Sequence, residues 1–309
     1  MIVTITLNPA VDRLYELEGF SIGNVFRADK VISRAGGKGI NVAKVCAELG
    51  EKVKVLGFLG GSNGQFIRGS IGTYGIIDSF VDIEGDTRAS INIIDRGNQT
   101  TTEILEKGPQ ISPGEVTDFM DVYRALIDEA RVVVLSGSLP QGIDSRIYGT
   151  LIHMARQKDK KVILDTSNEA LKEGIDHIPS AIKPNLEELR QITGKELKDD
   201  TSIIDAAVTL HKRGIELVCI TLGGEGAIAV YDDHIYKLEA TRLNVVNTVG
   251  CGDSFVAGIA VGYIRGLKLQ DILKLAMACG MSNTQFSEPG RVKRELVERY
   301  KDEVSILKI

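Results

Sequence analysis

Short runs of Val, Ile and Leu recur along the chain, and each run is bounded by turn residues. Such runs are typical of strands that are buried on both faces of a sheet. We predict strands at residues 2–7, 52–58, 131–135, 161–164 and 217–221. Stretches with helical periodicity lie between them, at residues 40–49, 115–129, 145–157 and 202–213. This alternation predicts an α/β fold in which helices cover both faces of a mainly parallel sheet.

Two segments, residues 15–33 and 88–107, instead alternate apolar and polar positions. Alternation marks strands that keep one face in water. We predict that they form a small separate β-sheet, a lid over the main domain, with strands from about residues 13–34 and 86–108. The alternative is that they are edge strands of the main sheet. After residue 253 two further helices are predicted, at 255–264 and 269–285, and no linker divides the chain, so we expect one domain over residues 1–309.

Composition and charge weigh against several kinds of partner. The net charge of −5 gives no reason to expect nucleic acid. The longest apolar stretch, residues 255–264, is about half of the roughly 20 residues that a membrane-spanning helix needs. Cysteines and histidines are scattered without the spacing of a disulfide framework or a zinc site. The first strand runs directly into Asn8-Pro9 without a secretion signal, so we expect a cytoplasmic protein with no membrane partner.

The run NTVGCGDS at residues 247–254 gives the clearest indication of chemistry. Gly250 and Gly252 allow a tight turn, and the apolar stretch that follows is typical of a buried helix. Unpaired amides at a helix N-terminus favour an anion. The Asp253 carboxylate would repel a phosphate bound at this helix end unless the carboxylate stood beside the phosphate, as the base for an incoming hydroxyl. Phosphoryl transfer requires that arrangement. The alternative is that Asp253 only caps the helix.

A second glycine turn, AGGKGINVAK at residues 35–44, opens another helix. It is not a Walker A loop, because Gly39 stands where that motif needs Ser or Thr after the lysine. The turn amides and the Lys38 ammonium can still bind an anion together. The alternative is a plain helix start with a solvated lysine.

Three further motifs follow buried strands, at the edge where open α/β sheets bind ligands. In KPNLEE, residues 183–188, Asn185 and Glu188 share a helix face and offer oxygen ligands for Mg²⁺, although a capping box is the alternative. A nucleotide could lie over the glycines of TLGGEGA, residues 221–227, whereas a tight β-hairpin would use the same residues. The run SGSLP, residues 136–140, falls at the same sheet edge.

The run GGSNG at residues 60–64 matches the nucleophile elbow of acyl hydrolases. Such an enzyme also needs an acidic residue and a histidine, for which His234 is a candidate. Because none of the four histidines lies in a recognisable motif, we interpret the run as a glycine-rich surface turn.

The chain resembles the PfkB sugar kinases of the ribokinase fold in the combination and order of its motifs. These motifs are NPAVD at residues 8–12, AGGKGINVAKVCAELG, SGSLP, KPNLEEL, TLGGEGA and TVGCGDSFVAG. The resemblance runs through nearly the whole chain. Within this family, the chain looks most like the branch that acts on phosphorylated ketohexoses. The similarity lies in the opening TLNPAVD, the Gly-Lys-Gly at 37–39 and the Asp-Thr-Arg at 86–88. That branch includes 1-phosphofructokinases and tagatose-6-phosphate kinases.

The resemblance implies a reaction centre and a substrate pocket. Asp253 would take the proton from the sugar hydroxyl that attacks the γ-phosphate of ATP. The anion hole would consist of the amides of Gly250, Cys251, Gly252 and Asp253. Sugar hydroxyls would be bound by Asp12, Gly37 and Asn41. The phosphate already on the substrate would be bound by Lys38 and Arg88, with Ser138 lining the pocket.

The resemblance also implies a nucleotide side. Asn185 and Glu188 would organise Mg²⁺, through water. The ATP molecule would be flanked by Thr221, Gly223 and Gly226, with Asn283 near the adenine. Asn247 stands where many relatives carry an aspartate associated with a monovalent-cation site, and a neutral amide is a poorer ligand for a cation.

The function implied by the resemblance is ATP-dependent phosphorylation of a ketohexose monophosphate to the bisphosphate. Fructose 1-phosphate is the first expected substrate, tagatose 6-phosphate the second and fructose 6-phosphate the third. A binding protein that kept the fold and lost catalysis is an alternative of another class, and the intact Asp253 argues against it. A lid with one apolar face could also pair two copies into a homodimer.

Overall fold

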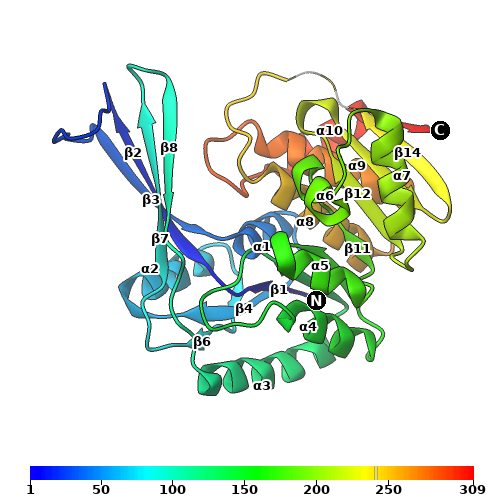
Figure 1. Cartoon of the computed structure of the whole chain (residues 1–309), viewed down its shortest axis with the longest axis horizontal. Coiled ribbons are helices and arrows are strands. Elements are labelled where there is room, and N and C mark those ends of the chain that lie inside the picture. Colours follow the sequence, from blue (N-terminus) through cyan, green and yellow to red (C-terminus); the bar gives the residue numbers. More distant parts are fainter. Residues whose placement is uncertain (240, 242) are drawn as a thin grey trace.

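The centre of the fold is an eleven-stranded sheet, seen in a computed structural model that describes every residue except 240 and 242 (Figure 1). Its parallel part has the order β12 (Leu217–Thr221), β11 (Ala181–Ile182), β10 (Lys161–Asp165), β9 (Val132–Ser136), β1 (Ile2–Thr6) and β4 (Val53–Leu59). The short strands β5 (Ile77–Asp78) and β6 (Val81–Asp82) both pair with β4. All five strands predicted from the apolar runs are present, which confirms the α/β fold.

Three antiparallel strands extend this sheet beyond β12, and the sequence analysis did not predict them. They are β13 (Ala227–Tyr231), β14 (His234–Glu239) and β15 (Ser305–Lys308). The β15 strand comes from the C-terminal end of the chain and pairs with β14, some 70 residues earlier in the sequence. The sheet is therefore mainly parallel, as predicted, with an antiparallel edge.

Helices cover both faces of the sheet because successive strand residues point to opposite sides. One face packs against α1 (Lys38–Glu48), α2 (Gly61–Gly72), α8 (Cys251–Arg265), α9 (Leu269–Asn283) and α10 (Arg294–Glu303). The other face packs against α3 (Pro113–Glu129), α4 (Ile147–Arg156), α5 (Asn168–Asp176), α6 (Leu186–Thr193) and α7 (Asp200–His211). In β1, Ile2 belongs to the first layer while Val3 and Ile5 belong to the second.

The lid is a separate four-stranded sheet that projects from the main body (Figure 1). Its order is β3 (Lys30–Gly36), β2 (Ala10–Leu17), β7 (Arg88–Asp95) and β8 (Thr100–Leu105). The prediction of a small separate sheet is confirmed, and the alternative of edge strands in the main sheet is wrong. Because β2 begins at Ala10 and β3 ends at Gly36, the lid joins the body directly at the NPAVD and GGKG motifs.

The GGSNG run opens α2, with Gly60 at its N-cap, instead of forming a surface turn. Ser62 is exposed in the first turn, and within the described residues it bonds to no histidine. The hydrolase reading therefore finds no support in the geometry. Within the described residues, the helices are too short or too polar to span a bilayer.

Candidate active site

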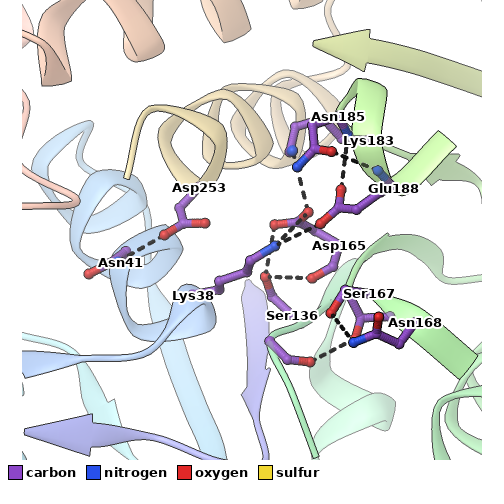
Figure 2. A network of polar contacts seen from close by, with 12 residues as sticks. Lys38, Asn41, Ser136, Asp165, Ser167, Asn168, Lys183, Asn185, Glu188 and Asp253 are labelled. Atoms are coloured by element: carbon purple, nitrogen blue, oxygen red, sulfur yellow. Dashed lines mark hydrogen bonds and ion pairs between the residues drawn. The ribbon is translucent and has the colours of Figure 1, made fainter. Parts of the chain in front are cut away.

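Asp253 lies in the first turn of α8, whose N-cap is Gly250 at a φ of 83°. The carboxylate is buried, and its Oδ2 accepts a hydrogen bond of 2.8 Å from Asn41 Nδ2 on α1 (Figure 2). Because Gly250 is the N-cap and no side-chain cap bond forms, the alternative that Asp253 caps the helix is wrong. A neighbouring helix holds this carboxylate, which leaves its second oxygen available beside the helix end.

The amides at the start of α8 differ in what they bond. Cys251 N donates to Thr248 O at 3.2 Å, so this predicted anion-hole donor is already engaged. For the amides of Gly250, Gly252 and Asp253, no backbone acceptor is found within the described residues. Unpaired N–H groups at the positive end of a helix attract an anion. Three of the four predicted donors therefore have no backbone partner within the described residues, while the fourth is bonded to Thr248 O, and binding of a phosphate oxygen by these amides stays a prediction.

Asp165, which the sequence analysis missed, lies at the end of β10 between two lysines. Lys38 Nζ and Lys183 Nζ each lie 3.4 Å from Asp165 Oδ1, and Lys38 Nζ lies 3.7 Å from Glu188 Oε1 (Figure 2). Burial acts to raise the pKa of Asp165, but the two ammonium groups outweigh it and lower that pKa. Its position directly after the buried residues Val162–Leu164, at the carboxyl end of a parallel strand, is the signal that could have identified it.

The surroundings of Asp253 make its carboxylate a stronger base than an ordinary aspartate. Burial raises the pKa of Asp253 to about 6, and the negative charge of Asp165 adds to the rise. Lys38, the hydrogen bond from Asn41 and then Lys183 act in the opposite direction. A carboxylate with a pKa nearer to neutrality holds a proton better, which suits a group that must accept one from a hydroxyl.

A polar cavity of about 190 Å³ brings together four of the predicted substrate residues, Gly37, Lys38, Arg88 and Ser138. Arg88 is fixed at its wall by a hydrogen bond of 3.2 Å from Nε to Asn8 O. Two cations facing one cavity suit a phosphate ester. The lining is completed by residues that the sequence analysis did not single out: Thr6, Asn8, Gly137, Thr166 and Ser167.

Asp12, the other predicted substrate residue on the lid, lies on β2 beside the start of α1. A Cβ on Gly36 would lie 2.0 Å from Asp12 Oδ2, so only glycine leaves room for this carboxylate. Burial raises the pKa of Asp12, while the positive charges of Lys44 and then Arg88 lower it. The structure therefore places Asp12 within the electrostatic reach of a cation that lines the cavity.

Asn185 and Glu188 form the capping box of α6, the alternative that the sequence left open. Glu188 N donates to Asn185 Oδ1 at 2.8 Å, and Asn185 N donates to Glu188 Oε2 at 2.9 Å. The other carboxylate oxygen, Oε1, faces Lys38. No cluster of three or more His, Cys, Asp or Glu that could hold a metal is present within the described residues. This donor set fits a magnesium ion that keeps water and phosphate ligands, and does not form a protein cage.

Thr221, Gly223 and Gly226 lie at the connection between β12 and β13. These strands are antiparallel and residues 223–225 form a single 3₁₀ turn, so the hairpin alternative is correct. Gly223 is exposed, whereas Gly226 is buried. A Cβ added to Gly226 would lie 2.0 Å from Leu238 O. A bridge between Thr221 and Asn185 sets this turn beside the N-terminus of α6. The hairpin leaves Gly223 accessible, and its contact with a nucleotide stays a prediction.

Asn283 is fully buried at the end of α9, and its amide is bonded within the protein. Nδ2 donates to Val249 O at 2.9 Å, while Oδ1 accepts from Gly290 N at 2.8 Å and from Ser254 Oγ at 3.3 Å. This side chain joins the turn before α8 to the loop after α9. Its predicted place near adenine stays a prediction, and the geometry adds a structural role.

Comparison with known proteins decides the family. Residues 5–292 match the pfkB family carbohydrate kinases. The chain belongs to this family. It is 38% identical to the tagatose-6-phosphate kinase of Staphylococcus epidermidis strain ATCC 12228 and 39% identical to that of strain RP62A, with 100% of both chains covered in each case. The motifs that carried the resemblance are therefore those of an ATP-dependent carbohydrate kinase.

Solved structures agree with this assignment. A possible 1-phosphofructokinase from Thermotoga maritima is 26% identical with a TM-score of 0.90, covering 100% of this chain and 99% of that one. Phosphofructokinase-2 from Escherichia coli has a TM-score of 0.90 at 22% identity, covering 97% and 98%, and shows the fold alone. The ribokinase-like fold expected for a PfkB kinase is confirmed.

The raised pKa of Asp253 predicts an acidic limb in the activity of this PfkB kinase. We expect kcat/KM to fall as the pH drops through about 6, because a protonated carboxyl does not accept the hydroxyl proton. Asn41→Ala removes a hydrogen bond that lowers this pKa, so the limb should move to higher pH. Profiles of kcat/KM between about pH 5 and 8 measure both positions. A limb that stays in place or moves to lower pH in the variant would contradict the assignment.

Proposed function

We propose that this chain transfers the γ-phosphoryl group of ATP to a hydroxyl of a ketohexose monophosphate, forming the bisphosphate and ADP. The observation that carries the proposal is the buried Asp253, held by Asn41 beside unpaired amides of α8. A second anion site lies nearby, in the cavity that Lys38 and Arg88 line. A phosphorylated acceptor needs both, one for its own phosphate and one for the group in transfer.

The chain's own residues account for most of the reaction. Asp253 accepts the proton of the attacking hydroxyl, and the hydroxyl oxygen forms the new bond to phosphorus as the bond to ADP breaks. Amides of Gly250, Gly252 and Asp253 stabilise the charge that develops on the transferred group. A lid that excludes water favours transfer to the sugar over hydrolysis.

Lys38 is placed to serve both anion sites. Its ammonium lines the cavity and lies between Asp165 and Glu188. Burial acts to lower the pKa of Lys38, but the carboxylates of Asp165, Asp253 and Glu188 raise it above its ordinary value, which keeps the side chain charged. We therefore extend its predicted role from the substrate's own phosphate to the phosphoryl group in transfer.

Magnesium would be held by Glu188 and Asn185 through water, with Asp165 close enough to contribute. Bound there, the ion would neutralise charge on the ATP phosphates. The Lys38 ammonium lies against the same carboxylates, so this group of residues is built to hold positive charge.

Two substrates have support. Fructose 1-phosphate is the first choice from the sequence motifs, and the Thermotoga relative of known structure is described as a possible 1-phosphofructokinase. Tagatose 6-phosphate is favoured by the two staphylococcal relatives, which match over the whole chain. Both are ketohexose monophosphates and both place an ester phosphate on the Lys38 and Arg88 cavity.

A parallel assay of ADP release tests the proposal. Purified protein with ATP and Mg²⁺ is offered fructose 1-phosphate, tagatose 6-phosphate, fructose 6-phosphate and unphosphorylated fructose. We expect clear preference for one phosphosugar. Equal turnover of fructose would contradict the phosphate-binding role of Lys38 and Arg88, and ADP release with none of the four would contradict the proposed function.

Arg88→Ala tests the phosphate contact directly. We expect KM for the phosphosugar to rise about tenfold or more, because one charge-assisted hydrogen bond is lost, while KM for ATP changes little. Arg124→Ala is the matched control, since it removes an equal charge from the exposed surface of α3. A rise confined to the KM for ATP would show that Arg88 serves the nucleotide instead.

We further propose that the protein is cytoplasmic and that the lid pairs two copies into a homodimer. All six residues of the edge strand β8 are exposed, including Ile104 and Leu105 at 51% and 62%. An exposed strand edge with apolar side chains is a ready surface for pairing. Sedimentation velocity should show a dimer for the native chain and a monomer for Leu105→Glu, and a monomeric native chain would contradict this.

A further inference from the structure

A second lysine of α1, Lys44, is buried outside the reaction centre. Only 2% of its side chain is exposed. Its Nζ donates to Ala35 O at 2.8 Å and lies 3.7 Å from Glu288 Oε1. Burial lowers the pKa of Lys44, while the charges of Glu288 and Asp12 raise it. A buried ammonium persists only where partners compensate it, so this contact is specific.

Glu288, the partner, belongs to the loop of residues 284–293 between α9 and α10. Its Oε1 also accepts a hydrogen bond of 3.0 Å from the hydroxyl of Tyr74, whose ring lies 5.7 Å from Lys44 Nζ. Arg291 NH1 approaches the other oxygen, Oε2, at 3.6 Å. The carboxylate therefore joins three parts of the chain.

The same loop is tied to the root of the lid. Ala35, whose oxygen Lys44 holds, pairs with Val11 of β2 at the end of β3. The preceding residue, Arg34, donates from NH1 to Ser287 O at 2.6 Å and from NH2 to Ser287 Oγ at 3.3 Å. These contacts connect the end of β3 directly to residues 287 and 288.

Gly290, two residues after Glu288 in the same loop, packs against the reaction centre. A Cβ on Gly290 would lie 2.7 Å from the Cα and Cβ of Asn41, the residue that holds Asp253. A Cβ on Gly250 would lie 2.7 Å from Gly290 N. Since interiors pack without spare room, a shift of this loop displaces Asn41 and the α8 turn.

We infer that the buried Lys44–Glu288 ion pair is a positioning contact that couples closure of the lid over the phosphosugar to the placement of Asn41 and the α8 turn. The inference rests on the proposed function, because it assigns the lid to a phosphosugar. Lys44 and Glu288 are not among the residues that line the substrate cavity, and they act through Ala35, Gly290 and Asn41.

Amide exchange of the full chain, with each phosphosugar alone, tests the coupling. In the native protein we expect the phosphosugar to slow exchange both in β2 and β3 and in residues 284–293. Glu288→Gln keeps an acceptor for Tyr74 and removes the charge. We expect it to retain protection of the lid, to lose protection of the loop, and to raise KM for the phosphosugar about tenfold while KM for ATP stays within about twofold.

Two further variants separate coupling from stability. Lys44→Arg keeps the charge of the pair and should retain loop protection, whereas Glu129→Gln breaks the exposed pair with Lys54 and should behave as the native chain. Equal loop protection in Glu288→Gln, or an equal rise in both KM values, would overturn the inference. Protection of lid and loop without turnover would refute the proposed function alone, and a native chain whose lid and loop respond to no phosphosugar would refute the coupling.

Discussion

Asp253→Asn is expected to fold normally and to lose kcat by a factor on the order of 10² or more, because the amide cannot accept the hydroxyl proton. The substitution keeps the size of the side chain and an oxygen that can accept the bond from Asn41. It also removes a buried charge whose ionisation the surroundings disfavour, as the raised pKa of Asp253 shows. We therefore expect no loss of thermal stability, and KM values close to those of the native enzyme.

Asp200→Asn is the matched control for this change. Asp200 also lies in the first turn of a helix, α7, but it is exposed and pairs with Lys237 at 2.9 Å. Its variant should keep native kcat. A folded Asp253→Asn protein with kcat within tenfold of native would show that another group is the base.

Gly250→Ala is expected to lower kcat by a factor on the order of 10², because it displaces together the amides of the turn that form the proposed anion hole. The residue has a φ of 83°, and its added Cβ would lie 2.7 Å from Gly290 N and 3.0 Å from Pro289 Cα. Relief of that overlap must turn the two peptide planes that flank Gly250, which carry the amides of Gly250 and Cys251, at the start of the turn that presents the anion-hole donors. Strain at such a backbone position also costs about 1–3 kcal/mol of stability.

Gly266→Ala separates the strain from the loss of the anion hole. Gly266 ends the same helix at a φ of 65°, and nothing lies within 4 Å of the position that its Cβ would take. Both variants should melt at lower temperature, but only Gly250→Ala should lose turnover. Equal kcat values in the two variants would contradict a catalytic role for the turn.

The sequence predicted five of the parallel strands because burial on both faces leaves an uninterrupted apolar run. It did not predict β13 and β14, which continue from the glycine turn after β12 and were interpreted only as a possible hairpin. The helix α2 was missed because Gly61, Gly64, Gly69 and Gly72 lower its helix propensity. The helix is stabilised instead by the packing of its buried Ile67 and Ile71 on the core.

The reaction centre was predictable where a motif is local and not where it is assembled from distant parts. Asp253 and the glycines before it form one turn, so their chemistry is visible in eight residues. The contact of Asp165 with Lys38 joins residues 127 positions apart and depends on the sheet order. Tertiary contacts likewise show that Asn185 and Glu188 form the capping box of α6 and that the remaining carboxylate oxygen of Glu188 faces Lys38, which the spacing alone does not reveal.

The central claim is transfer of phosphate from ATP to a phosphosugar, and a ³¹P NMR time course of the native enzyme tests it most directly. The sample contains ATP, Mg²⁺ and the phosphosugar that the assay selects. We predict that ADP and one new sugar phosphate ester appear in equal amounts, with the original ester retained in the bisphosphate. Release of inorganic phosphate in step with ADP, without a second ester, would contradict the account.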